Sequence, residues 1–258
     1  MKFSWANRLA LCCPGRSSTD WTVIGSEQAR ASHDFVFCSK HELLFSLNFS
    51  NSRQLEAWDL KNPSSPRLVW SCDFNDLGME CDNGGEPPSM KEEIKEFSDR
   101  HEYFVASHQE YLVVSQQGDL FYVKRYIKRC MLPDGSCAPF DLANDISYPA
   151  KTIGFDVYKI VRDGDKGKKV FMDGHLNGLV MFVGDPSQGI AIPAADANGF
   201  KSDSICFTSD HRNSSSRHGT DNGIFDFKEK KSFSCYYPFD YNSLKNKISP
   251  PPLWFTPN

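Results

Sequence analysis

Short apolar runs alternate with polar turns along most of the chain, and the alternation is clearest between Thr152 and Asp210. The apolar runs in this stretch are residues 153–160, 170–172, 179–183, 190–192 and 205–208. Each run has the length of a strand, and none is long enough for a typical helix. The breaks between them carry Gly, Asp or Pro, the residues that tight turns require. The pattern predicts sequential antiparallel strands, as in a meander, a sandwich or a propeller.

One sequence pattern, an apolar run followed by a polar turn and a second apolar run, recurs from Trp21 onward. It occupies residues 43–60, 111–123, 179–192 and 205–227, and further apolar runs at 35–37, 68–70, 103–105 and 233–237 supply additional strands. Because a propeller blade has four strands, these runs supply enough strands for about four blades.

Three insertions interrupt the repeating sequence pattern, at residues 73–100, 130–149 and 211–222. The first is acidic and contains a capping box at 89–92, which predicts a short helix over 90–97. The second is irregular, and the third is rich in Ser, Arg and His. We expect all three to be loops at the edges or faces of the blades, where recognition is usually found.

The composition changes this picture little. The chain has 258 residues, of which 40% are hydrophobic, and its 20 Phe residues are expected to fill much of the packing between sheets. A net charge of -4 gives no basic field for nucleic acid. The nine cysteines are scattered without a C-x-x-C pair. Because Cys38, Cys206 and Cys235 lie in apolar strand patterns, we expect buried free thiols in a reducing compartment.

The first residues differ from the rest in charge. Residues 1–19 hold Lys2, Arg8 and Arg16 and no acidic side chain, which is typical of an organelle transit peptide. The apolar run at 9–13 is too short to span a membrane. We expect residues 1–20 to be a leader, either disordered or targeting, and residues 21–258 to form the propeller domain. A truncated chain with a ragged start is the alternative.

No catalytic signature survives inspection. Residues 164–168 lack the spacing of a phosphate-binding loop and predict a charged hairpin turn. The seven histidines form no helical metal-binding pair, although His211 and His218 share one loop with two aspartates. We nominate no catalytic, cofactor-binding or metal-binding residue, and we expect no cofactor.

A basic run follows one apolar strand pattern: Lys124, Arg125, Lys128 and Arg129. In a strand these charges divide between two faces. The run therefore predicts an edge strand protected by charge rather than a stripe that follows phosphates.

Several of these strands resemble, in order, the strand motifs of one plant family. They are GDLFYVKRY at 118–126, FDVYKI at 155–160, the runs at 179–184, 205–208 and 222–227, and the closing PLWFTP at 252–257. They resemble the F-box-associated β-propeller of the kink-suppressed-in-bikinin (KIB) type, strongly from about residue 111 to 258 and more weakly from 21 to 74. The resemblance implies an all-β fold of antiparallel four-stranded blades, about four in number, in an incomplete or open β-propeller.

In that family a separate F-box docks on the Skp1-like adaptor of a cullin-type ubiquitin ligase, and the propeller holds the target protein. Here an F-box and the leading propeller segment are expected to be absent. The resemblance thus implies a non-enzymatic protein-binding propeller with an unknown target, without adaptor docking, nucleic acid or membrane. It also implies an intracellular location, in cytoplasm or nucleus.

Two alternatives remain. The acid-free leader favours an organelle-targeted relative without an F-box, in mitochondrion or plastid. A hydrolase or lyase that uses carboxylates at the propeller centre is the other, although the sequence singles out no residue set for it.

Overall fold

The computed structural model describes residues 9–11, 22–24, 32–49, 53–82, 107–128, 151–164, 166–184, 189–208 and 221–234. Within these ranges the chain forms strands, turns and short connections, and no helix. The all-β fold class is therefore confirmed. The described part of the chain also contains no helix with the length and apolar character that crossing a membrane requires.

The first four-stranded unit is an antiparallel meander that forms a sheet of its own. We name it the first blade, and its strands are β3 (Ser32–Cys38), β4 (Leu43–Phe49), β5 (Arg53–Asp59) and β6 (Arg67–Asp73). Each strand contains one of the apolar runs expected from the sequence. Side chains alternate between two faces of the sheet, as the period of a strand requires.

A second antiparallel meander follows, which we name the second blade. Its strands are β8 (Ser107–Ser115), β9 (Leu120–Lys128), β10 (Lys151–Asp163) and β11 (Lys166–Phe171). Gly118 has a φ of 88° in the β8–β9 turn, and Gly164 has a φ of 60° in the β10–β11 turn. The hairpin expected at residues 164–168 is therefore present, with its turn at 164–165 and residues 166–168 within β11.

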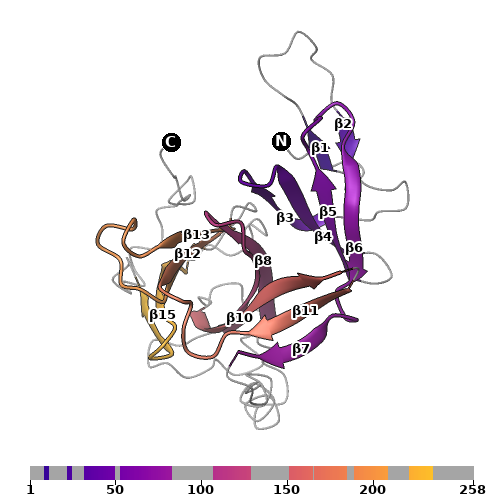
Figure 1. Cartoon of the computed structure of the whole chain (residues 1–258). Helices are drawn as coiled ribbons and strands as arrows, with labels where there is room; N and C mark the ends of the chain where they lie inside the picture. The colour runs from indigo at the N-terminus through magenta and orange to yellow at the C-terminus, as the bar shows by residue number, and fades with distance from the viewer. Residues whose placement is uncertain are drawn as a thin grey trace, which may run out of the picture.

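The remaining strands continue the sheet of the second blade. They are β12 (Leu179–Val183), β13 (Gly189–Pro193), β14 (Ser204–Phe207), β15 (Gly223–Asp226) and β16 (Lys231–Ser234). β13 pairs with β8 in parallel, and β12 pairs with β14 in parallel. The result is a ten-stranded sheet that curls into an open half-barrel (Figure 1). The described residues thus form an open, incomplete propeller.

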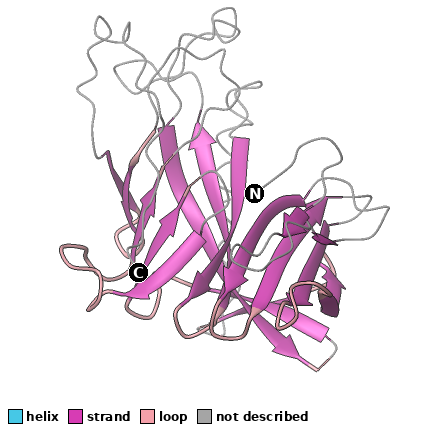
Figure 2. Cartoon of the chain, turned by 90° about the horizontal axis from the view of Figure 1, so that it is seen from above, coloured by secondary structure: helices cyan, strands magenta, loops and turns pink. Residues whose placement is uncertain are grey.

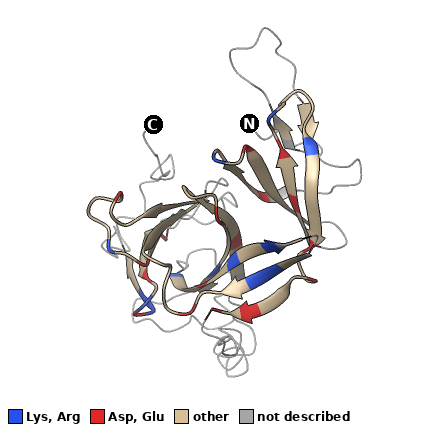
Figure 3. Ribbon diagram, viewed as in Figure 1, with Lys and Arg blue, Asp and Glu red and all other residues tan. Residues whose placement is uncertain are grey.

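Three short strands lie outside the repeating sequence pattern. β7 (Gly78–Cys81) belongs to the first expected insertion and pairs in parallel with β11, where Lys168 and Glu80 form an ion pair of 2.8 Å. Figure 3 shows the basic segment of β11 beside the acidic segment of β7. β1 (Leu9–Leu11) and β2 (Thr22–Ile24) pair with each other, so part of the expected leader is a strand. The expected helix at 90–97, the run at 103–105, the insertion at 130–149, residues 211–220 and Cys235 lie outside the described residues.

Figure 2 shows the first blade and the curled sheet from above. Two large hydrophobic cores organise the molecule, and one of them joins apolar side chains of β8 to β10 and of β12 to β15. Five phenylalanines belong to it, which fits the expected role of Phe in packing: Phe121, Phe155, Phe207, Phe225 and Phe227. The other core lies between the two blades and joins apolar side chains of both.

Polar contacts fix the two blades along the inter-blade core. The backbone N–H of Leu112 on β8 donates to the carboxylate of Asp34 on β3. Near the turns, the Lys40 ammonium donates to the carbonyl oxygen of Gln117 at 2.7 Å. The innermost strands β3 and β8 therefore lie side by side, as they do in neighbouring propeller blades.

Candidate functional site

The strand register brings the borders of two expected insertions, 130–149 and 211–222, and the start of β8 to one end of the curled sheet. Ser107 begins β8 opposite Ile127 near the end of β9, and Lys128 pairs with Lys151 where the second insertion leaves and returns. β14 ends and β15 begins at the same end, where Phe207 pairs with Gly223. We name this end the loop rim and define it by its bordering residues, Ser107, Lys128, Lys151, Thr208 and Asp221.

The opposite end of the curled sheet carries compact connections. β8 and β9 are joined by residues 116–119, β10 and β11 by 164–165, and β15 and β16 by 227–230. Two of the three expected insertions, 130–149 and 211–222, are therefore bordered by the loop rim, whereas the first begins at the end of β6 and contains β7. Scaffolds that present long loops at one end commonly use that end for recognition.

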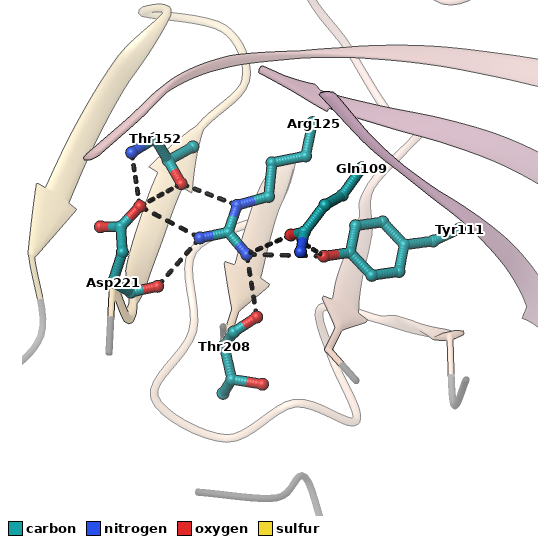
Figure 4. Close-up of polar contacts among 6 residues, drawn as sticks. All are labelled: Gln109, Tyr111, Arg125, Thr152, Thr208 and Asp221. Atoms are coloured by element: carbon teal, nitrogen blue, oxygen red, sulfur yellow. Dashed lines mark hydrogen bonds and ion pairs between the residues drawn. The ribbon is translucent and has the colours of Figure 1, made fainter. Parts of the chain in front are cut away.

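A buried arginine holds the loop rim together (Figure 4). Arg125 on β9 has a fully buried side chain, and its Nε donates to the Thr152 hydroxyl at 2.7 Å. Its Nη1 donates to the Thr208 carbonyl at 2.9 Å, and its Nη2 donates to both the carbonyl and the carboxylate of Asp221, at 2.9 and 3.1 Å. Asp221 also accepts from the backbone N–H and the hydroxyl of Thr152. One guanidinium thus joins β9, β10 and both borders of the segment 209–220.

The remaining contacts of Arg125 come from β8 and from the core. Nη1 also lies 3.3 Å from Gln109 Oε1 and 3.5 Å from the Tyr111 hydroxyl, and the guanidinium stacks 4.6 Å from the centre of the Phe207 ring. A guanidinium has five N–H donors in a fixed fork, and these partners account for all of them. Arg125 is therefore a structural clamp and offers no donor to a ligand.

The sequence reading of the basic run was wrong in one respect. β9 lies between β8 and β10 and is a central strand, so it is not an edge protected by charge. The division of charges between two faces is confirmed, because Lys124 is half-buried while Arg125 is buried on the other face. A signal was present in the sequence: Phe121, Val123 and Arg125 share one face of the strand, and the first two are core residues.

A second polar cluster lies between the blades. The Glu110 carboxylate, with only 2% of its side chain exposed, forms an ion pair with Arg53 of the first blade at 2.9 Å and lies 3.1 Å from Nε2 of His108. Burial and the nearby Lys124 ammonium hold the pKa of His108 below its usual value, against an opposite effect of Glu110. Burial, and then the Glu110 carboxylate, raise the pKa of the Tyr122 hydroxyl.

A third buried carboxylate belongs to β10. Asp156 accepts a hydrogen bond of 2.6 Å from the Tyr126 hydroxyl, and burial followed by this carboxylate raises the pKa of Tyr126. Burial and the Asp156 carboxylate raise the pKa of the Tyr158 hydroxyl as well. The buried carboxylates Asp156 and Glu110 are therefore bound to neighbouring protein groups, which fits a role in joining strands and blades.

The described cysteines are free thiols, as expected: Cys38, Cys72, Cys81 and Cys206. Burial, with the charges of Asp73 and Asp76, raises the pKa of Cys72 to about 11. This thiol is therefore protonated at neutral pH and is a poor nucleophile. Among the described residues no group of His, Cys, Asp and Glu is arranged to hold a metal ion. His211 and His218 lie outside those residues.

Comparison with known proteins gives one positive result. A family model, the KIB1-4 beta-propeller, matches residues 1–227. Neither the curated proteins nor the solved structures gave a significant match. A propeller of this kind is typically a non-enzymatic interaction fold. The family match, the two antiparallel blades and the open curled sheet lead to one conclusion: this chain belongs to the KIB1-4 β-propeller family.

Proposed function

We propose that this protein is a non-enzymatic protein-binding propeller that receives its target at the loop rim. The observation that carries the proposal is the common position of the strand ends that border the insertions 130–149 and 211–222. The Arg125 clamp supports it, because it fixes Thr208 and Asp221, the two borders of the segment 209–220. A fixed base lowers the entropy that such a segment loses when it binds.

The cellular role that we propose is that of the substrate-binding part of an F-box receptor in a cullin-type ubiquitin ligase. The support for this role is the ordered resemblance of the strand motifs. In our proposal residues 1–258 hold the target and do not dock on the Skp1-like adaptor themselves. Robust direct binding of the purified chain to that adaptor would contradict this part of the proposal.

The target site is tested by exchanging loops. In one variant a Gly-Ser linker of equal length replaces residues 211–219, and in the matched control the Glu229–Lys230 turn at the opposite end is changed to Gly-Ser. Each tagged chain is expressed in plant cells, and its associated proteins are quantified by mass spectrometry. We expect proteins enriched with the unmodified chain to fall at least tenfold with the first variant and to remain with the control. Equal recovery with both variants would exclude the loop rim as the target site.

A second candidate role follows from the acid-free composition of residues 1–19. If the chain is an organelle-targeted relative, residues 1–20 fused to a fluorescent reporter should direct it to mitochondria or plastids. A diffuse signal would exclude this role. It would leave the first proposal, in cytoplasm or nucleus, unaffected.

A further inference from the structure

The second blade carries a fifth strand that comes from an earlier part of the chain. β8 to β11 already form a complete four-stranded meander, and β7 is added to the outer edge of β11 (Figure 1). The added pair is parallel and runs from Lys168 opposite Gly78 to Phe171 opposite Cys81. The backbone N–H of Asp82 extends it by donating to the Phe171 carbonyl at 3.1 Å. Parallel pairing is slightly less stable per residue than the antiparallel pairing within the blade.

Protection of an open edge does not account for this strand. A sheet edge is protected when a helix, a loop or a charged strand ends it. In the described part of the chain β7 is itself the last strand of the ten-stranded sheet. Adding β7 therefore exchanges the open edge of β11 for another open edge, and the pairing calls for a different explanation.

The segment that contains β7 has a buried half and an exposed half, and we name residues 74–82 the strap. Phe74 and Leu77 belong to the inter-blade core, and 3% and 5% of their surfaces are exposed. β7 itself is mostly exposed, and Met79 has an exposed fraction of 51%. Gly78 stands at the boundary with open space at its Cβ position. Because glycine has wide backbone freedom, the exposed half can change direction there while the buried half stays in place.

Two acidic side chains and the backbone hold the exposed half on the blade. Glu80 forms its ion pair with Lys168 at 2.8 Å, with exposed fractions of 57% and 34% for the two side chains. The Asp82 carboxylate accepts from the backbone N–H of Asp173 at 3.3 Å and lies 3.1 Å from Nε2 of His175. Exposed ion pairs of this kind contribute little to stability. β7 is therefore held by groups that any extended strand with suitably placed carboxylates could supply.

The edge of β11 has the chemistry of a receptor for such a strand. It offers the backbone groups of β11 and, beside them, the Lys168 ammonium, the Asp173 N–H and the His175 imidazole. Residues i and i+2 of a strand lie on the same face, so carboxylates at alternate positions reach these groups, as Glu80 and Asp82 do. Addition of a strand to a sheet edge is a common mode of peptide recognition, in which side chains at alternate positions give specificity.

We propose that the outer edge of β11 is a binding surface for an extended acidic segment of a partner protein, with carboxylates at alternate positions. In the free protein residues 78–82 occupy this surface as an intramolecular competitor. The partner strand pairs with residues 168–171, while Phe74 and Leu77 keep the strap anchored in the inter-blade core. The blades therefore stay joined when the strands exchange.

This surface is separate from the loop rim. β11 pairs with residues 158–163 of β10, whereas the loop rim borders Lys151 at the beginning of that strand. Because the competitor is tethered, its effective concentration is in the millimolar range that short linkers give. A partner must exceed this competition, and weakening the strap should strengthen partner binding. The proposal does not depend on target binding at the loop rim.

A peptide added to the full chain tests the proposal. The peptide has the sequence of residues 77–82 with Cys81→Ser to prevent oxidation, and it carries a fluorescent label for anisotropy measurements. The competitor is weakened by Glu80→Gln combined with Asp82→Asn, which keeps the shape of both side chains. We expect this variant to bind the peptide at least fivefold more tightly than the unmodified chain does. A peptide with both acidic residues changed to their amides should bind at least fivefold more weakly.

A charge reversal locates the peptide. In the weakened variant, Lys168→Glu should lower the affinity at least fivefold. Lys61→Glu, at an exposed lysine in the β5–β6 connection, is the matched control and should leave the affinity unchanged. Equal losses with the two reversals would indicate general attraction between charges and would overturn the proposal. Equal affinities of the unmodified chain and the weakened variant, or no binding to either, would also overturn it.

Hydrogen exchange in the unmodified chain gives a test that needs no variant. Excess peptide should accelerate the exchange of the amides of residues 79–82 at least threefold, because the strand is displaced, and should leave β4 unchanged. Exchange that stays the same at residues 79–82 would show that β7 is a permanent strand of the sheet and would contradict its role as a competitor.

Discussion

One side chain, Arg125, joins four separate parts of the chain at the loop rim. A buried guanidinium is costly unless its donors are bonded, and here they reach Thr152, Thr208 and Asp221 as well as two side chains of β8. A planar fork suits this site because its donors diverge in fixed directions. Lysine carries its charge at one point, so its ammonium could not bond all of these acceptors.

The first prediction concerns this clamp. Arg125→Met removes one partner of a buried ion pair and leaves Asp221 without it, so the free energy of unfolding should fall by about 3–5 kcal/mol. Urea denaturation followed by circular dichroism measures the change. The neighbour Lys124, half-buried on the opposite face, provides the control, and Lys124→Met should cost about 1 kcal/mol or less. Equal losses for the two variants would show that Arg125 is not a clamp.

The second prediction concerns His108 and pH. Burial and Lys124 lower its pKa in the folded chain below the ordinary value of 6.5, so the unfolded chain binds more protons as the pH falls. The stabilising contribution is complete above pH 6.5 and is lost as the pH falls towards the pKa of the folded state. We expect the free energy of unfolding to decrease on acidification below about pH 6.5.

His108→Gln tests this assignment, because glutamine keeps a polar side chain and does not titrate. Denaturation at a series of pH values above the range of the carboxylates should show a weaker pH dependence for the variant than for the unmodified chain. Identical slopes would assign the effect to another group.

At the scale of the element, most strands follow local rules. The runs expected from alternation became β3 to β6, β8 to β15 and part of β16, and Gly118 and Gly164 stand in the turns that connect paired strands. These features depend on residues close in sequence: a side-chain period of two and a glycine where φ is positive. Pairing between distant strands follows no such local rule.

The third prediction separates the backbone of a turn from its packing. Gly118 has a φ of +88°, and a Cβ there would lie 2.3 Å from Nε2 of His41 in the first blade. Gly174 has a φ of +73° with nothing near its Cβ position. Alanine at position 174 should therefore cost only the backbone strain, about 1 kcal/mol, and alanine at position 118 should cost more.

The His41→Ala background checks the source of the difference. Thermal denaturation of the single and double variants should show that Gly118→Ala costs no more than Gly174→Ala once the imidazole is removed. A difference that persists in this background would point to strain in the turn itself.

At the scale of the whole molecule, the two blades share one core and should unfold together. Leu112 on β8 is fully buried in that core, and its backbone N–H donates to Asp34 of the first blade. Arg53 and Glu110 form a further link between the blades. Because the described strands form no closed ring, such contacts cover sheet faces that would otherwise be exposed.

The fourth prediction follows from this shared core. Leu112→Ala should lower the free energy of unfolding by roughly 2–5 kcal/mol, and hydrogen exchange should accelerate equally in β4 and in β12. Met79→Ala, at an exposed position, should change stability by less than about 0.5 kcal/mol. Faster exchange confined to one blade would show that the two sheets are independent units.

The sequence alone determined the strands, their turns, the all-β class and the resemblance to a propeller family. These properties arise from alternation over a few residues and from turn chemistry, which act before distant parts of the chain meet. The position of the insertions between strands was also readable, although the meeting of two of them at the loop rim was not.

Only the tertiary structure decided the rest. The parallel pairing of β13 with β8 and of β7 with β11, the inter-blade core and the burial of Arg125 depend on contacts between residues distant in sequence. A basic residue in a strand pattern has no intrinsic preference between a solvated edge and a buried clamp. Its place is fixed by whether the folded chain brings acceptors to all of its donors, and here Gln109, Thr152, Thr208 and Asp221 do so.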